Sequence, residues 1–220
     1  MENKNVLTRR DLYLGLLAGL IIGLLALPVI KAAKESLYNQ LAVFLVPFFL
    51  LAVPIGLVIA NWISKKIAVV WQISKFIVIG GMNTLVDLGV LSLITFAFRS
   101  FFGIQSKDIL IFTLTFYSLF KATSFIVANI SSYYWNKYWT FHKDSSEEKE
   151  GGNGAKFLQF FLVSIIGFVI NVLVASYVFK AIHPFDGLNP DQWGLIGAAC
   201  GSIAGLAWNF LGYKFIVFKK

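Results

Sequence analysis

The side chains best suited to chemistry are a carboxylate and its polar neighbours within a stretch that is otherwise apolar. On a helix they share one stripe, because they stand at positions i, i+3, i+4 and i+7: Gly80, Asn83, Thr84 and Asp87. An ionised aspartate near the centre of a bilayer costs roughly 2.5 to 3.5 kcal/mol. We therefore expect the Asp87 side chain to face a partner, a cavity or a ligand.

Lys121 is the cation that suits Asp87. Each lies at a similar depth within its own apolar run, 76–98 for Asp87 and 109–134 for Lys121, so both are expected near the membrane midplane. Two readings stay open, and they are compatible. Asp87 and Lys121 form a structural ion pair, or they belong to a substrate site.

Composition predicts the class of protein that must position these residues. Of 220 residues 58% are hydrophobic and only 14% are charged, and the mean hydropathy is +0.75, which indicates an all-α integral membrane protein. The net charge of +8 comes from cations at the ends of apolar runs, so we expect anionic phospholipids as neighbours and no nucleic acid. No other typical metal-ligating residues accompany His142 or His183 at metal-site spacing in the sequence, so neither a metal nor a cofactor is expected.

Six apolar runs are long enough to span a membrane. They predict an N-terminal hairpin (1–63), a cytoplasmic interfacial segment (64–75), and a four-helix core (76–220) with a hydrophilic linker at 144–156. Most lysines and arginines fall on the side of the N-terminus, which places both termini in the cytoplasm by the positive-inside rule. The runs are 12–30, 41–63, 76–98, 109–134, 157–182 and 193–217.

The core contains an internal repeat, 76–143 and 157–220. A shift of 84 positions lays Asn83 and Asp87 on Gly167 and Asn171, and near the end a shift of 77 lays 137–141 on 214–218. Each unit has an even number of spans, so the two copies point the same way across the membrane. The fold class is thus six transmembrane helices, a hairpin plus two parallel two-helix repeats, with a cleft between the halves as the expected binding place.

Three groups of residues resemble the GtrA-like family of polytopic membrane proteins over residues 75–220. They are the opening 76–84, Ala128-Asn129 followed by 136–141, and Trp208-Asn209 before 213–218. The resemblance implies work on polyprenyl-phosphate-linked sugars. Such proteins move these lipids across the bacterial cytoplasmic membrane or support a membrane-associated glycosyltransferase that makes them. The resemblance does not explain the additional hairpin.

Such a lipid needs a cation for its phosphate, amide and hydroxyl groups for its sugar, and an apolar side opening for its tail. In the fourth run, polar residues recur at mostly helical spacing from Ser118 to Asn136 and form a polar track that includes Lys121. Lys137 follows at the cytoplasmic end of this track, and the second repeat adds amides and a lysine. The candidate substrate-binding residues are therefore Asn83, Asp87, Lys121, Asn129, Asn136, Lys137, Asn171, Asn209 and Lys214.

Structural readings compete with each of these assignments. Asparagine and serine side chains also join helices through hydrogen bonds, and Lys137 and Lys214 beside aromatic residues also anchor span ends at the interface. Gly197, Gly201 and Gly205 at four-residue spacing indicate close helix packing, within this chain or in a homodimer. Trp208 stacks on a sugar ring or fills a packing gap.

No sequence signature of catalysis is present, because the chain shows no nucleotide loop, nucleophile elbow or carboxylate pair. We therefore expect a protein that is not an enzyme. The first hypothesis is flipping of a polyprenyl-phosphate-linked monosaccharide. The second is an adapter that recruits a glycosyltransferase through 64–75 and 142–156, and the third is a small multidrug-type transporter with Asp87 as proton carrier.

Overall fold

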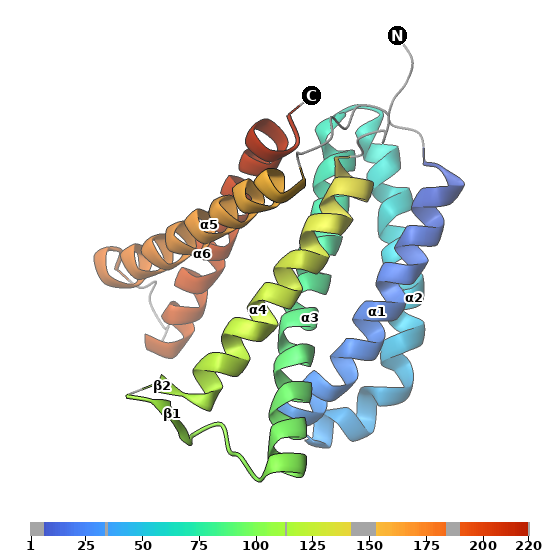
Figure 1. The fold of residues 1–220 in the computed structure, drawn as a ribbon. Helices are drawn as coiled ribbons and strands as arrows, with labels where there is room; N and C mark the ends of the chain where they lie inside the picture. The colour runs from blue at the N-terminus through green and yellow to red at the C-terminus, as the bar shows by residue number, and fades with distance from the viewer. Residues whose placement is uncertain (1–6, 34, 113, 142–152, 184–189, 220) are drawn as a thin grey trace. The chain divides into compact units, whose positions relative to one another are not determined.

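A computed structural model describes residues 7–33, 35–112, 114–141, 153–183 and 190–219 (Figure 1). The chain folds as two compact units, Met1–His142 and Lys143–Lys220. Within these residues, the first unit holds four long helices and a short hairpin of strands, and the second holds two long helices. Each unit ends in a short π-helix. The elements of the first unit are α1 (Arg9–Ala33), α2 (Glu35–Ser64), α3 (Val69–Phe102), β1 (Ile109–Ile111), β2 (Leu114–Thr115), α4 (Phe116–Trp135) and η1 (Asn136–Thr140).

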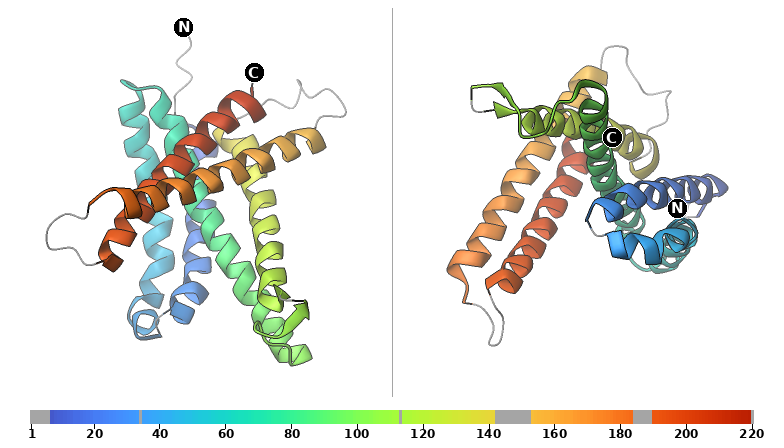
Figure 2. Two further views of the ribbon diagram at one scale, coloured as in Figure 1. Left: turned by 90° about the vertical axis from the view of Figure 1, so that its left-hand side faces the viewer. Right: turned by 90° about the horizontal axis from the view of Figure 1, so that it is seen from below.

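A stripe of glycines holds α1 against α2, and both helices run side by side in Figures 1 and 2. A Cβ atom added to Gly23 would lie 2.8 Å from Cα of Val46, and one added to Gly19 would collide with the carbonyl oxygen of Phe49. Only glycine lets the two backbones approach this closely. Close packing was predicted only for the glycines of the last apolar run, and this stripe was not predicted.

The N-terminal hairpin packs into the first predicted repeat. α3 contacts α1, α2 and α4, and the buried core joins Leu57 of the hairpin to Ile79 and Met82 of α3 and to Trp139 of η1. The sequence predicts the hairpin as a domain beside a four-helix core and assigns it no role. Part of its apolar surface is buried against α3, so hairpin and first repeat share one hydrophobic core.

The interfacial segment expected at 64–75 does not form a separate helix. α2 continues to Ser64, and α3 begins at Val69 and runs without interruption to Phe102. Trp71 and Lys75, which we had placed at a membrane interface, are buried in the first turns of α3. Their contacts inside the protein extend the helix towards its N-terminus, so the predicted start of the third span is wrong.

The helix expected over 109–134 begins later. Residues 109–115 contain two short antiparallel strands, with Ile109 paired to Thr115, and the turn between them passes through Phe112 at φ 51°. Short apolar runs rich in β-branched residues cannot be told from helix by periodicity alone. Because α4 begins at Phe116, Lys121 lies in its second turn and not in the middle of a span.

Four described helices are long and apolar enough to cross a membrane, at Arg9–Lys31, Glu35–Ser64, Val69–Phe102 and Gly154–Val178. The chain is therefore a multi-pass membrane protein with a largely helical fold. The second unit comprises α5 (Asn153–Ala181), α6 (Pro190–Gly212) and η3 (Tyr213–Val217). Residues 153–156 of the predicted linker belong to α5, and 144–152 lie outside the described residues.

Close backbone contact also joins α5 and α6. A Cβ atom on Gly205 would lie 2.8 Å from the carbonyl oxygen of Gly167, which confirms the packing role expected for Gly205. Trp208 lies beside this contact, and its Nε1–H donates to the carbonyl oxygen of Val163 at 3.1 Å. The Trp208 indole therefore joins the two helices.

Candidate functional site

Asp87 and Lys121 meet at the contact between α3 and α4. Nζ of Lys121 forms an ion pair with Oδ2 of Asp87, and the Ser124 hydroxyl donates to Oδ1 of Asp87 at 2.6 Å. Both oxygens of the carboxylate are thus engaged. The contact expected from the sequence is confirmed, and Ser124 is a partner that the sequence analysis did not name.

The pair is closed on one side and open on the other. Ser124 is fully buried and the Asp87 side chain is 19% exposed, whereas the Lys121 side chain is 40% exposed. An ammonium group has three donors, and one points at Asp87. The arrangement can therefore keep a neutral pair in an apolar helix contact and still present N–H donors to an anion from the open side.

The asparagines further along this polar track are buried and bond to their own helix. Asn129 Nδ2 donates to the carbonyl oxygen of Phe125 at 2.9 Å, and Asn136 Nδ2 donates to that of Ser132 at 2.9 Å. Among the described residues, Oδ1 of Asn136 and Oδ1 of Asn83 are buried acceptors that receive no hydrogen bond. Such atoms are costly to leave unpaired, and both belong to predicted site residues.

Lys137 and Lys214 occupy the same place in two matching π-helices. Each lies one residue after the start of its segment, and the final N–H donations, Phe141 to Asn136 and Phe218 to Tyr213, are alike at 2.9 and 2.8 Å. Single-turn π segments often mark functional sites. The segments are η1 (Asn136–Thr140) and η3 (Tyr213–Val217), which are themselves 77 positions apart and, offset by one residue, overlap the stretches 137–141 and 214–218 aligned in the sequence.

Both lysines lie over two aromatic rings. Lys137 Nζ is 6.0 Å from the ring centre of Tyr133 and 5.1 Å from that of Tyr138. Lys214 Nζ is 5.6 and 5.4 Å from the rings of Phe210 and Phe215, which occupy the corresponding positions. Lys137 is only 2% exposed, so it is held within the protein and does not extend from a helix end as an interfacial anchor would.

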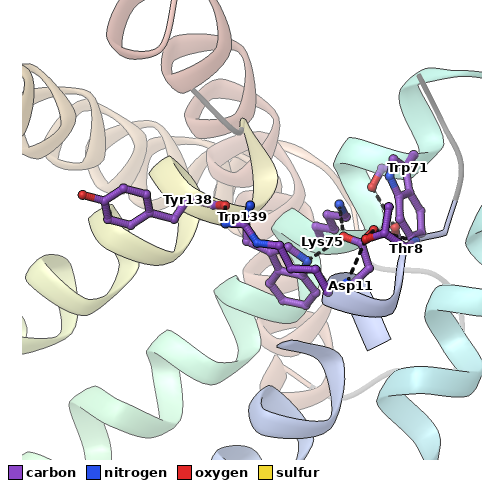
Figure 3. A network of polar contacts seen from close by, with 8 residues as sticks. Thr8, Asp11, Trp71, Lys75, Tyr138 and Trp139 are labelled. Carbon is purple, nitrogen blue, oxygen red and sulfur yellow. Dashed lines mark hydrogen bonds and ion pairs between the residues drawn. The ribbon is translucent and has the colours of Figure 1, made fainter. Parts of the chain in front are cut away.

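A further ion pair, which is buried and was not predicted from the sequence, ties α1 to α3 (Figure 3). Nζ of Lys75 lies 2.5 Å from Oδ1 of Asp11, and both side chains are less than a tenth exposed. Thr8 completes the site, because its hydroxyl donates to Oδ2 of Asp11 at 2.6 Å while Asp11 N–H donates to the Thr8 hydroxyl at 3.1 Å. The sequence pattern that could have pointed to Thr8 and Asp11 is the capping box, Thr-x-x-Asp, ahead of an apolar run.

The same pair fixes η1. The indole N–H of Trp139 donates to Oδ1 of Asp11 at 3.1 Å, and Lys75 Nζ lies 4.4 Å from the Trp71 ring centre and 5.9 Å from that of Trp139. Arg10 adds a bond from Nη2 to the carbonyl oxygen of Tyr138 at 2.8 Å. In Figure 3 the Tyr138 ring points away from Asp11, so the two neighbouring aromatics of η1 face different surroundings.

In the second unit the predicted site residues lie at the contact between α5 and α6. The Asn209 side chain lies against Gly167, and the Asn171 side chain lies against Gly205. Nearby, Ser164 and Tyr213 share a hydrogen bond of 2.6 Å, and the Tyr213 ring stacks on Phe160 at 4.1 Å. Both asparagines pack between these two helices, and Oδ1 of Asn209, like those of Asn83 and Asn136, is a buried acceptor that receives no hydrogen bond within the described part of the chain.

A fold of long apolar helices with charged pairs held between them defines an integral membrane protein. The model of the GtrA/DPMS transmembrane-domain family matches residues 75–218, and the chain belongs to this family. It is also 24% identical over 146 residues to an uncharacterized membrane protein, YngA, of Bacillus subtilis, covering 66% of this chain and 78% of that one. No solved structure matches the chain, and α1 and α2 lie outside the matched family region.

Proposed function

We propose that this protein flips a polyprenyl-phosphate-linked monosaccharide across the bacterial cytoplasmic membrane. Six spans, two parallel repeats and cytoplasmic termini are part of the proposal, supported by the six apolar runs and the distribution of cations along the sequence. Membership of the family supports the lipid class. The observation that carries the proposal is the half-open Asp87–Lys121 pair between two apolar helices.

The pair supplies a phosphate site that is neutral when empty. In the resting state Asp87 balances the charge of Lys121, which lowers the cost of placing the cation among apolar side chains. An arriving phosphate group competes with the Asp87 carboxylate for the ammonium, and Ser124 keeps a hydrogen bond to the carboxylate meanwhile. Lys121 keeps an anionic partner throughout this exchange, and Asp87 keeps its hydrogen bond from Ser124 while the phosphate holds the ammonium.

The sugar and the lipid tail need different surroundings. Oδ1 of Asn83 and Oδ1 of Asn136 are buried acceptors without a described hydrogen-bond donor, so sugar hydroxyls would satisfy them if the helices part to admit the headgroup. The tail stays in the bilayer beside the exposed apolar side chains of α4, such as Ile126 and Ile130. Lys137 in η1 is 2% exposed beside two tyrosines, so it would meet the phosphate as a second cation only after η1 opens.

Reconstitution tests this proposal. Vesicles that contain the purified protein are loaded on one side with labelled polyprenyl-phosphate sugar, and its arrival in the opposite leaflet is followed over time. We expect a rate above that of empty vesicles and of vesicles with an unrelated multi-pass protein, and no acceleration for phosphatidylglycerol. A rate equal to that of empty vesicles overturns the flippase proposal and leaves the adapter hypothesis, which recovery of a bound glycosyltransferase from membranes would then support.

A further inference from the structure

A polar pocket lies at the end of α3 farthest from Lys75. It has a volume of about 310 Å³ and is lined by the last turns of α3 and by the loop that follows. That volume is at the lower end of the range for small-molecule sites, roughly 300 to 1,000 Å³. Its lining residues are Thr95, Arg99, Gln105, Ser106 and Lys107.

Backbone hydrogen bonds hold the loop that forms this pocket. Gly103 ends α3 at φ 68°, a conformation that glycine adopts readily, and the next N–H, that of Ile104, donates to the carbonyl oxygen of Phe98 at 3.2 Å. At the other end, Tyr117 N–H donates to the carbonyl oxygen of Ser106 at 2.9 Å. The loop is thus fixed to both helices, and its side chains have defined positions.

The pocket carries two positive charges that no acid of the described residues neutralises. Neither Arg99 nor Lys107 forms an ion pair within the described part of the chain. Asp108 is the nearest acid in the sequence, but it does not line the pocket, and its Oδ2 accepts the backbone N–H of Gln105 at 2.7 Å. A guanidinium, an ammonium, an amide and two hydroxyls are the donors that bind phosphate oxygens.

We propose that this pocket is a phosphate-binding site, separate from the Asp87–Lys121 pair and assembled by Arg99 and Lys107. Its ligand is a phosphate ester, either the headgroup of a lipid or a soluble sugar phosphate. Lys121 stands four residues beyond Tyr117, about 6 Å along α4, so the two cationic sites lie along one end of the same helix pair. The pocket binds phosphate whether or not the protein moves a lipid.

Binding to the purified full-length protein in detergent tests the site, with inorganic phosphate, glucose 1-phosphate and farnesyl phosphate as probes. We expect at least one probe to bind, and R99Q/K107Q to weaken its binding by about tenfold or more, because two charge-assisted contacts are lost. If only farnesyl phosphate binds, the ligand is a lipid headgroup. If glucose 1-phosphate binds similarly, the ligand is a soluble phosphate ester. Absence of binding by all three probes, or equal binding to R99Q/K107Q, overturns the proposal.

The matched control is K65Q/K66Q, which removes the same charge from two exposed lysines between α2 and α3. It should bind the probe as the wild type does. A second measurement places the ligand directly: Ser106→Cys in a C200A background, once shown to bind the probe as the C200A protein does, is labelled with a thiol reagent with and without the probe. Protection of this cysteine by the bound probe is expected, and an unchanged labelling rate shows that the phosphate lies elsewhere.

Discussion

Nζ of Lys75 lies 2.5 Å from Oδ1 of Asp11, inside a contact that joins α1 to α3. The same carboxylate oxygen accepts the indole N–H of Trp139 in η1. One buried carboxylate therefore holds together the N-terminal hairpin, the first repeat and the π-helix that carries Lys137. This relationship gives the hairpin, which lies outside the family match, a structural role in positioning η1.

Asp11→Asn should destabilise the protein strongly. Lys75 would keep its charge in a buried place without its partner, a loss of about 3 to 5 kcal/mol. Thermal unfolding of the purified protein in detergent measures the effect as a lower midpoint. The double variant D11N/K75Q removes both charges and should recover part of the loss. A midpoint of D11N equal to that of the wild type contradicts the assigned role of the pair.

Trp139→Phe tests the bond between η1 and Asp11. The substitution keeps an aromatic ring but removes the N–H donor, so we expect a loss of about 1.5 to 3 kcal/mol, the value for a hydrogen bond to a charged group. Trp62→Phe is the control, because Trp62 is 69% exposed. Its unfolding midpoint should stay near that of the wild type, and equal shifts in both variants would argue against the Asp11 contact.

Gly19→Ala should separate α1 from α2. Its new methyl group would collide with the carbonyl oxygen of Phe49, and such overpacking costs about 1 to 3 kcal/mol. Gly56→Ala is a matched control in the partner helix, because nothing lies within 4 Å of a Cβ atom there. We expect G56A to be neutral or slightly stabilising in the same unfolding measurement. Equal stability of the two variants would contradict the packing described for the hairpin.

The contact between Asp87 and Lys121 could be predicted from the sequence because a charged side chain in an apolar run needs a partner of opposite charge. A buried charge without a partner is costly, which favoured an ion pair as one of the two readings of these residues. The alignment of 137–141 with 214–218 likewise anticipated two matching segments, although their π-helical form had no signal in the pattern.

The Asp11–Lys75 pair was not predicted because the position of each residue in the sequence could be explained without a contact between them. Lys75 was one of many cations near a span end, and Asp11 follows two arginines. Local patterns carry no information on which of several cations a folded chain brings to a given carboxylate. The strands at 109–115 were missed for a similar reason, since apolarity is shared by buried strands and spans.

The half-open pair of Asp87 and Lys121 is the centre of this account, and the variant D87N/K121Q tests it most directly. Its neutral side chains can still hydrogen-bond between α3 and α4, so the fold should persist. The control is K180Q in α5, which removes one exposed lysine outside the pair. In reconstituted vesicles we expect D87N/K121Q to flip polyprenyl-phosphate sugar about tenfold more slowly or worse, because the phosphate loses its charged donor. Flipping at the wild-type rate by a folded D87N/K121Q protein would show that the pair only joins two helices.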